Sequence, residues 1–432
     1  MHVAVVGLWH LGCVTAASLA AGGHTVIGVD FDADVIRGLR QGRAPLFEPG
    51  LDDLIAAGIE AGRLTFSGEA AGVSAGEVIW ITYDTPVDQD DRADVEFVIA
   101  QTARLFPAIR DGALVLVSSQ VPVGTTARLE RMFAAEHPGN ARVTFGYSPE
   151  NLRLGKALAA FQQPARVVAG VRTEADRARV SALFARYTDR IEWMSVESAE
   201  MTKHALNAFL ATSVAFANEI AMLCEVTGAD AKEVERGLKS EPRIGPGAYV
   251  SPGAAFAGGT LARDLVFLSE LGRQHERPAR LLTSARESNE AHKQWAADRL
   301  KLELGELKSH RIAVWGLAYT PGTDTLRRSS AVELCRRLHQ EGATIIAYDP
   351  AVKALPDDLA PIINLVAGPV EALAGTSALV VATAWPEFRS VSAAQVAGAM
   401  KTACVLDPAR FLGASLGDDP RIRYITVGQG HA

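Results

Sequence analysis

The chain carries the same local pattern near both of its ends. Residues His2–Gly7 (HVAVVG) resemble Arg311–Gly316 (RIAVWG), and Gly22–Asp30 (GGHTVIGVD) resemble Gly342–Asp349 (GATIIAYD). Each copy is a short β-branched run, a glycine turn, a helix-favouring stretch, and a second apolar run that ends in aspartate. This order predicts strand, turn, helix and strand, and so two Rossmann-like units, one at each end.

Between the two copies the pattern changes. Short apolar runs at 78–81, 113–117 and 167–171 alternate with helical stretches, which favours a parallel, doubly wound sheet. From Ser198 to Thr227 the sequence reads as one long helix, with Ser195 or Ser198 available to cap it. Further helical sequence is interrupted by a loop rich in glycine and proline at 242–259, a length typical of functional loops.

We therefore predict an α/β protein of three parts. Residues 1–195 form an N-terminal Rossmann-like domain, residues 196–307 a central helical domain, and residues 308–432 a C-terminal Rossmann-like domain. The length of 432 residues suits two or three domains.

Composition excludes several classes of function. The formal net charge of -7, with acidic residues scattered along the chain, argues against nucleic-acid binding. The four cysteines are isolated from one another and from histidines, so we expect no metal site and no disulfide framework. The first residues show no signal peptide, and no apolar run reaches the length of a membrane span, so we expect a cytoplasmic protein without a membrane partner.

The first glycine turn is a candidate dinucleotide site. Gly7 and Gly12 stand at the first and third glycine positions of the Gly-x-Gly-x-x-Gly fingerprint, but Trp9 replaces the middle glycine that lets backbone approach a pyrophosphate. Asp30, at the end of the second strand, suits a ribose with free hydroxyls, which favours NAD over NADP. The alternative is a Rossmann-shaped domain without dinucleotide, in which Trp9 fills the groove.

Motifs along nearly the whole chain resemble one family. In chain order these are Pro45–Leu51 (PLFEPGL), Val121–Thr126 (VPVGTT), Ser148–Arg153 (SPENLR), Lys203–Asn207, Asn218–Ile220, Gly316–Tyr319, Asp324, Arg327 and Trp385–Phe388 (WPEF). Together they resemble the UDP-glucose/GDP-mannose dehydrogenase family. The resemblance implies an NAD-dependent oxidoreductase of nucleotide sugars in polysaccharide biosynthesis, with UDP-sugars favoured as substrate. It also implies a homodimer packed through the long helix, although the apolar stripe of that helix has the alternative of being covered within the monomer.

The resemblance assigns catalytic roles to five residues. Lys203 and Asn207 share a helix face at spacing i, i+4, where an amine and an amide can polarise a developing alkoxide. Asp264 helps to activate a proton acceptor, Glu150 is linked to acid/base work, and Thr260 is positioned to hydrogen-bond a substrate hydroxyl. The alternatives are a solvated lysine with a cap-like asparagine, and a surface carboxylate.

The depth at which the long helix is buried helps to decide whether Lys203 is catalytic or merely solvated. Phe209, Val214 and Ile220 predict that the helix is mostly buried, and a buried ammonium is costly unless it is used.

The resemblance also implies two sets of binding residues. The cofactor set comprises Gly7, Trp9, His10, Leu11, Gly12, Asp30, Thr85 and Gln120. The substrate set comprises Arg153, Tyr249, Gly258, Arg263 and Arg327. A guanidinium at position 327 suits a diphosphate because it can bind bidentately, and Tyr249 lies in the loop that closes over the sugar nucleotide. The alternatives are a solvated charge at Arg327 and a packing role for Tyr249.

The chain departs from the family at its nucleophile. The family oxidises a primary alcohol to a carboxylate in two hydride transfers through a cysteine thioester, and Thr260 occupies that cysteine position. A threonine hydroxyl is not a nucleophile without a strong base, whereas a thiol is partly ionised near neutral pH. Arg263 and Ala262 replace a neighbouring lysine and proline. Gln120 replaces a water-orienting threonine, and Thr320 replaces a phosphate-binding lysine.

These departures leave four hypotheses. The first is a two-electron oxidation of an alcohol to an aldehyde or ketone. The second is a full four-electron dehydrogenase without a covalent intermediate. The third is a redox-neutral epimerase that holds NAD permanently, and the fourth is a nucleotide-sugar-binding protein without catalysis.

Overall fold

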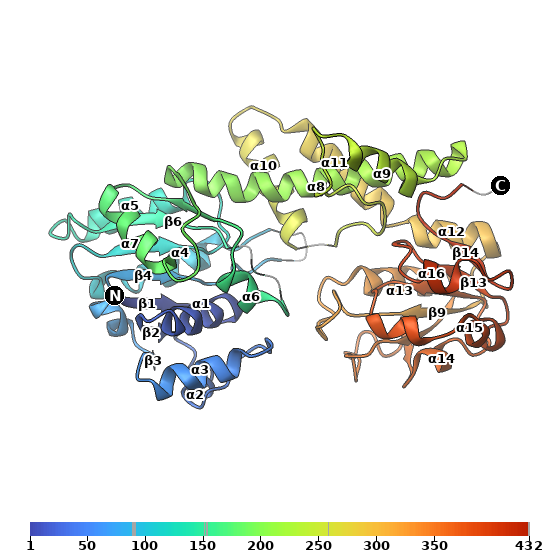
Figure 1. The fold of residues 1–432 in the computed structure, drawn as a ribbon, viewed down its shortest axis with the longest axis horizontal. Coiled ribbons are helices and arrows are strands. Elements are labelled where there is room, and N and C mark those ends of the chain that lie inside the picture. Colours follow the sequence, from blue (N-terminus) through green and yellow to red (C-terminus); the bar gives the residue numbers. More distant parts are fainter. Residues whose placement is uncertain (89–91, 151, 153, 258, 431–432) are drawn as a thin grey trace. The chain divides into compact units, whose positions relative to one another are not determined.

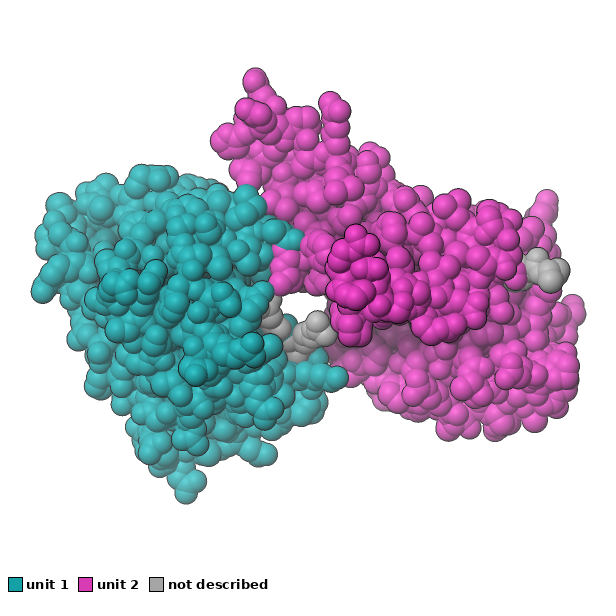
Figure 2. Space-filling view, turned by 45° about the horizontal axis from the view of Figure 1, so that its top comes forward, with its two compact units in different colours: residues 1–205 teal, residues 206–432 magenta. Residues whose placement is uncertain are grey.

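The computed structural model describes residues 1–432 except 89–91, 151, 153, 258 and 431–432. The described chain divides into two compact units, Met1–Ala205 and Leu206–Ala432 (Figure 2, teal and magenta). Each unit contains one β-sheet (Figure 1). The α/β class with two Rossmann-like sheets is confirmed, and the division into three domains at 195/196 and 307/308 stays a prediction.

Unit 1 is built on an eight-stranded sheet of order β3-β2-β1-β4-β5-β6-β7-β8. Its strands are β1 (His2–Val6), β2 (Thr25–Val29), β3 (Leu64–Ser67), β4 (Val78–Ile81), β5 (Leu114–Val117), β6 (Thr144–Tyr147), β7 (Val167–Gly170) and β8 (Ile191–Met194). The pairs are parallel except β6 with β7, which run antiparallel. The sheet changes direction of growth between β1 and β4, and such a switch point is where α/β sheets bind dinucleotides.

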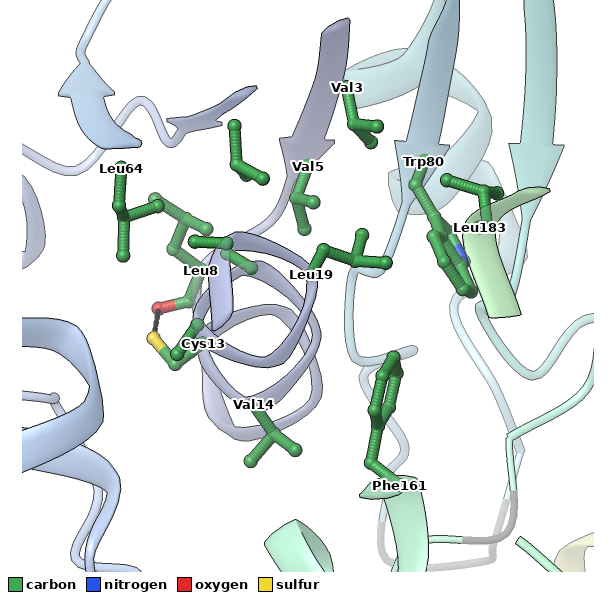
Figure 3. Close-up of a cluster of buried hydrophobic side chains, with 14 of the residues drawn as sticks. Val3, Val5, Leu8, Cys13, Val14, Leu19, Leu64, Trp80, Phe161 and Leu183 are labelled. Atoms are coloured by element: carbon green, nitrogen blue, oxygen red, sulfur yellow. Dashed lines mark hydrogen bonds between the residues drawn. The ribbon is translucent and has the colours of Figure 1, made fainter. Parts of the chain in front are cut away.

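Helices cover both faces of this sheet. They are α1 (His10–Ala21), α2 (Ala33–Arg40), α3 (Leu51–Glu60), α4 (Val95–Ala103), α5 (Thr125–Glu136), α6 (Ala157–Gln162) and α7 (Glu174–Phe184), with short 3-10 turns η1 (Ala70–Ala75) and η2 (Phe106–Ala108). One core joins α1, α3, α6 and α7 to the sheet, with Trp80, Phe161 and Leu183 among its members (Figure 3). The other core joins α4 and α5 to the opposite face. Strands buried on both faces explain the continuous apolar runs of β4, β5 and β7.

Helix α8 (Val196–Thr227) is the long helix predicted from the sequence. The Ser195 hydroxyl accepts a hydrogen bond from the Ser198 amide at 3.2 Å, which caps its first turn. The prediction that this helix is mostly buried is wrong, because only 33% of its most apolar window is buried. Phe209 is 70% exposed, and Val214 and Ile220 are half-buried. Helical periodicity fixes which residues share a face, but the neighbours that cover a face come from distant sequence.

The expectation that no stretch reaches the length and apolarity of a membrane span is also wrong. Helix α8 passes that test by length and composition, with mean hydropathy 1.4 in an 18-residue window. Polar residues such as Asn207 and Asn218 interrupt the apolar run, yet the average over a window stays high. A single such helix is weak evidence, because core helices of soluble proteins pass the same test.

Unit 2 begins with the rest of α8 and further helices, namely α9 (Ala231–Ser240), α10 (Thr260–Gln274), α11 (Arg280–His292) and α12 (Trp295–Leu304). The loop between α9 and α10 is held by buried side chains. The Asn289 carboxamide exchanges hydrogen bonds with the Phe256 backbone, and the Asn218 carboxamide accepts from the Gly253 amide. His292 binds the Gly253 carbonyl through Nε2. The loop is therefore ordered over its described residues.

The second sheet is parallel, with order β11-β10-β9-β12-β13-β14. Its strands are β9 (Arg311–Trp315), β10 (Thr344–Tyr348), β11 (Ile363–Leu365), β12 (Ala378–Val381), β13 (Cys404–Leu406) and β14 (Arg423–Ile425). Its helices are α13 (Ser330–Gln340), α14 (Pro369–Ala372), α15 (Ala393–Ala399), α16 (Gly413–Leu416) and the 3-10 turn η3 (Pro386–Ser390). One core contains α12 and α13, and the other contains α14, α15 and α16.

Candidate active site

The turn between β1 and α1 has the backbone of a dinucleotide cradle. Gly7 has φ of +93°, which side chains disfavour, and a Cβ on it would lie 2.7 Å from the Tyr83 ring. A Cβ on Gly12 would lie 2.0 Å from the Gly7 carbonyl oxygen. Both positions therefore require glycine. Helix α1 begins at His10 with no side-chain cap, so its first amides face an anion site.

Trp9 stands at the middle position without blocking this turn. Its φ of -90° is ordinary for any side chain, and it is the N-cap residue of α1. The residue is 44% exposed. With Trp9 in place, Gly7 and Gly12 keep the close backbone contacts that define the turn.

Asp30 lies beside this cradle at the end of β2. Its carboxylate accepts hydrogen bonds from the Leu8 amide at 2.6 Å and from the Asp32 amide at 2.9 Å. The residue is half-buried, so its remaining lone pairs face outward. A carboxylate held here is suited to the ribose hydroxyls of NAD. The buried Tyr83 hydroxyl has no hydrogen-bond partner among the described residues, and burial raises the pKa of that phenol. These residues fit NAD.

Glu48 is a buried residue of the Pro45–Leu51 motif whose role was not predicted from the sequence. Its carboxylate binds His10 Nε2 at 2.9 Å and accepts from the amides of Gly155 at 2.8 Å and Ala157 at 2.7 Å. It therefore fixes the start of α1 to the segment before α6. The signal for this role was a charged residue inside an apolar, proline-bounded motif.

Thr85 and Gln120, both predicted to contact the cofactor, are joined directly. The Thr85 hydroxyl donates to the Gln120 carbonyl at 2.7 Å, and Thr85 is buried whereas Gln120 is half-buried. They follow β4 and β5, two neighbouring strands of the sheet. The geometry thus places them together at the carboxyl edge of unit 1, on the side away from Asp30.

Two pockets are large enough for a ligand. One is a recess of about 490 Å³ in unit 2, and the other is a recess of about 330 Å³ in unit 1. The recess in unit 1 lies at the carboxyl edge of β4, β5 and β6, and Leu11, Ser118, Glu150 and Leu152 are among its lining residues. It extends from the first turns of α1 past the loop that carries Glu150 to the segment between α6 and β7. This position suits the reacting end of a dinucleotide whose ribose lies at Asp30.

Lys203 reaches the same loop. Its ammonium donates to the Glu150 carbonyl oxygen and lies 3.8 Å from the Glu150 carboxylate. The lysine is buried, as predicted, and its neighbour His204 binds the Val121 carbonyl at 2.9 Å. The buried ammonium thus has the Glu150 carboxylate as its nearby counter-charge. Arg153, predicted to bind substrate, lies outside the described residues.

Asn207 follows one turn later on α8 and belongs to unit 2. Its side-chain amide donates to the Asp264 carboxylate, and both residues are buried. Asp264 lies in the second turn of α10, whose first residue is Thr260. The structure thus joins two of the predicted catalytic residues in a buried pair.

The other predicted residues of unit 2 are more open. Thr260, Tyr249 and Arg327 are exposed, and Arg263 is half-buried. A Cβ on Gly259 would lie 3.9 Å from both the Tyr319 hydroxyl and the Arg328 side chain, so these groups surround the start of α10. Burial raises the pKa of Tyr319, and the charge of Arg263 opposes this rise. Gly258 lies outside the described residues.

The larger recess, in unit 2, lies at the carboxyl edge of the second sheet. It is lined by Gly253, His292, Ser330, Ala382 and Pro408, among others. The side chain of Ser329, the N-cap residue of α13, donates to the Leu317 carbonyl and does not cap the helix. Residues along α13, from its first turn to its last turn, line this recess, and helix N-termini favour anionic groups.

All four cysteines are buried. Burial raises the pKa of the Cys335 and Cys404 thiols to about 12, and it also raises the pKa of Cys13 and Cys224. The Cys13 thiol donates to the Leu8 carbonyl at 3.3 Å (Figure 3). Thiols in this state are not nucleophiles near neutral pH. Within the described residues, no group of His, Cys, Asp and Glu side chains is arranged to hold a metal ion.

Two mainly parallel sheets, with a glycine cradle and a half-buried aspartate in the first, define a dinucleotide-dependent protein of the oxidoreductase type. Comparison with known proteins agrees. Residues 1–188 match the NAD binding domain of the UDP-glucose/GDP-mannose dehydrogenase family, residues 197–291 its central domain, and residues 313–414 its UDP binding domain. The chain belongs to this family, and it is an NAD-dependent nucleotide-sugar dehydrogenase.

Individual relatives are similar over their full length. The chain is 34% identical to a UDP-glucose 6-dehydrogenase of Pseudomonas aeruginosa, covering 94% of this chain and 93% of that protein. It is 32% identical to a UDP-glucose 6-dehydrogenase of Rhizobium meliloti, covering 99% and 100%. Among solved structures, a UDP-glucose dehydrogenase from Pyrobaculum islandicum matches with TM-score 0.88 at 28% identity, covering 100% of this chain and 98% of that one.

Proposed function

We propose that the chain oxidises one hydroxyl of a nucleotide sugar, with a UDP-sugar favoured, by a single hydride transfer to NAD. The observation that carries this proposal is that every cysteine is buried with a raised pKa, while Thr260 stands exposed at the start of α10. A second oxidation through a thioester needs an accessible thiolate. The printed names of the relatives support a UDP-sugar, since two of them act on UDP-glucose.

The proposed chemistry divides among a few side chains. NAD, when bound, accepts the hydride from the sugar carbon. Lys203 and Asn207 stabilise the alkoxide that forms when the hydroxyl loses its proton, because an ammonium and an amide in a dry site lower the energy of developing negative charge. Asp264 orients Asn207, and Glu150 exchanges the proton with solvent. Thr260 donates a hydrogen bond to a substrate hydroxyl.

The remaining predicted residues bind the cofactor or the sugar nucleotide. Gly7, Gly12 and the first turn of α1 hold the pyrophosphate, Asp30 the ribose, and Thr85 with Gln120 the nicotinamide half. In unit 2, Arg263 and Arg327 neutralise the diphosphate, and Tyr249 covers the sugar nucleotide. We propose Arg153 and Gly258 as substrate contacts as well.

Counting NADH tests the proposal. A panel of UDP-, GDP- and dTDP-sugars is screened for NAD reduction, and the active sugar is then supplied in known, limiting amount. We expect one NADH per sugar and an aldehyde or ketone product. Two NADH with an acid product would indicate the four-electron reaction. Isotope exchange without NADH would indicate an epimerase, and binding without turnover a non-catalytic protein.

Two matched cysteine variants provide a second test, in which the NADH formed per sugar is counted again. Thr260→Cys places a thiol at the proposed position, whereas Thr283→Cys places one on the exposed face of α11. We expect acid product and a second NADH from Thr260→Cys alone. Acid product from the unmodified protein would overturn the proposal.

The lysine role has its own test. We expect Lys203→Met to lower kcat by about 10²–10³, as loss of one group that stabilises a developing oxyanion does, with Lys232→Met as the control for a lysine on another helix. An unchanged kcat for Lys203→Met would remove this residue from the reaction.

We also propose a homodimer. Apolar side chains form a stripe along α8 that includes Phe209, Phe216, Leu223 and Val226, and the last is 80% exposed. Their spacing places them on one face of the helix, and a second copy of the same face would cover it. The alternative of a stripe covered within the monomer is wrong for these four residues. Light scattering should give twice the chain mass, and Phe216→Asp should give a monomer. A monomeric unmodified protein would contradict the proposal.

A further inference from the structure

Arg104 and Phe31 form a stacked pair in unit 1. The guanidinium carbon of Arg104 lies 3.5 Å from the centroid of the Phe31 ring. Phe31 directly follows Asp30 at the carboxyl end of β2, and Arg104 is the C-cap residue of α4, the helix that follows β4. The pair therefore joins the two chain segments that leave the sheet on either side of β1.

The cofactor runs toward this pair. A pyrophosphate on the first turn of α1 and a ribose at Asp30 fix the direction of the adenosine half, since these groups follow one another along the dinucleotide. The adenine ring then lies beyond Asp30, on the side away from the glycine turn. Phe31 is the next residue in the chain, so the adenine ring reaches the Phe31–Arg104 pair.

Within this pair, the Arg104 guanidinium offers the flat surface on which a ring can stack. One face of the Phe31 ring is covered by the guanidinium, while Arg104 itself is exposed. Arg104 Nη1 also donates to the Gln101 side chain at 2.8 Å, which limits rotation of the group. Guanidinium planes stack on nucleobases as aromatic rings do, and a group already held in place loses little entropy on binding.

We propose that the Arg104 guanidinium, held on Phe31 and Gln101, is the platform on which the adenine ring of NAD stacks. Arg104 is then a specificity-determining residue for the adenosine half of the cofactor. It acts through its plane rather than through attraction of its charge for the phosphates.

Calorimetric titration of separate cofactor fragments tests this assignment. NAD, ADP-ribose and nicotinamide mononucleotide are titrated into the full chain and into Arg104→Ala. The control is Arg177→Ala, because the Arg177 guanidinium lies 5.7 Å from the Trp193 ring centroid at β8, away from the cradle. We expect Arg104→Ala to weaken NAD and ADP-ribose about tenfold, as loss of one stacked base contact does, and to leave the mononucleotide unchanged.

Arg104→Lys separates plane from charge and also covers the case in which the alanine variant fails to fold. We expect it to weaken ADP-ribose binding nearly as much as alanine does. Full affinity in Arg104→Lys would show that charge alone acts, and it would overturn the proposal. So would an ADP-ribose affinity within twofold of the unmodified protein in Arg104→Ala.

Discussion

The six strands of the second sheet follow the same order as the first six strands of unit 1. The two sheets differ in the contacts of the aspartate that follows their second strand. Asp30 in unit 1 accepts two backbone amides and stays half-buried. Asp349 in unit 2 is buried, and its carboxylate accepts from the amides of Leu317, Ala318, Ala351 and Val352 and from the Trp385 indole. The Asp30 carboxylate keeps the capacity to bind a ligand, whereas the Asp349 carboxylate is fully engaged in hydrogen bonds within the protein.

The helix after the turn differs as well. Helix α1 begins at His10, just after Gly7, whereas α13 begins at Ser330, well after Gly316. The longer segment in unit 2 leaves the glycine turn and returns to it, because the hydroxyl of Ser329, the N-cap residue of α13, donates to the Leu317 carbonyl beside Gly316. Both helices therefore begin near their glycine turn, and the clearer difference between the two units is the aspartate.

The largest expected effect comes from the glycines. Gly12→Ala should weaken NAD binding by at least about 100-fold, because its Cβ would collide with backbone in the pyrophosphate cradle. Gly316→Ala, whose Cβ would lie 2.4 Å from the Thr383 carbonyl, should lower Tm and leave the NAD Kd within twofold. Titration and thermal unfolding of both variants measure this. An equal loss of NAD affinity in the two variants would contradict the difference between the two units.

The aspartates should give the next effect. Asp349→Asn should lower the free energy of unfolding by about 2–4 kcal/mol, since buried amides lose a charged acceptor. Asp30→Asn should change stability by less than about 1 kcal/mol but relax the preference for NAD over NADP by about tenfold. Denaturant unfolding and the kcat/KM ratio for the two cofactors separate these outcomes. The comparison fails if Asp349→Asn alters cofactor choice.

Cysteines of the two units should behave alike. Cys13 on α1 and Cys335 on α13 are both buried with raised pKa, and at pH 8 a thiol whose pKa is about 12 is almost wholly protonated. Iodoacetamide should therefore label neither in the native protein at pH 8, both after denaturation, and activity should persist. Rapid native labelling with loss of activity would restore a thiol mechanism.

The smallest effect is expected at Trp9. Because the residue is 44% exposed, Trp9→Gly should change NAD affinity by less than about threefold. A gain of tenfold or more would mean that the indole obstructs the cradle after all.

Local patterns in the sequence predicted the elements well. The apolar runs became β4, β5 and β7, and the long helical pattern became α8. Contacts between distant residues were not predictable. Glu200 lies near the N-terminus of its own helix, but its carboxylate accepts from the amides of Gly124 at 2.6 Å and Thr126 at 2.9 Å, at the start of α5.

The same limit applies to the candidate site. The spacing of Lys203 and Asn207 predicted one helix face, because helical periodicity is local. Their partners Glu150 and Asp264 were proposed through the resemblance alone, since loops and other helices bring them close. The anchoring role of Glu48 and the exposure of Phe209 likewise depend on which distant segments pack nearby.

The stoichiometry of NAD binding tests the difference between the two sheets most directly. Calorimetric titration of the full chain should give one NAD per chain. Binding should be lost in Gly12→Ala and retained in Asp349→Asn. Two NAD per chain, or one that survives Gly12→Ala, would contradict the account.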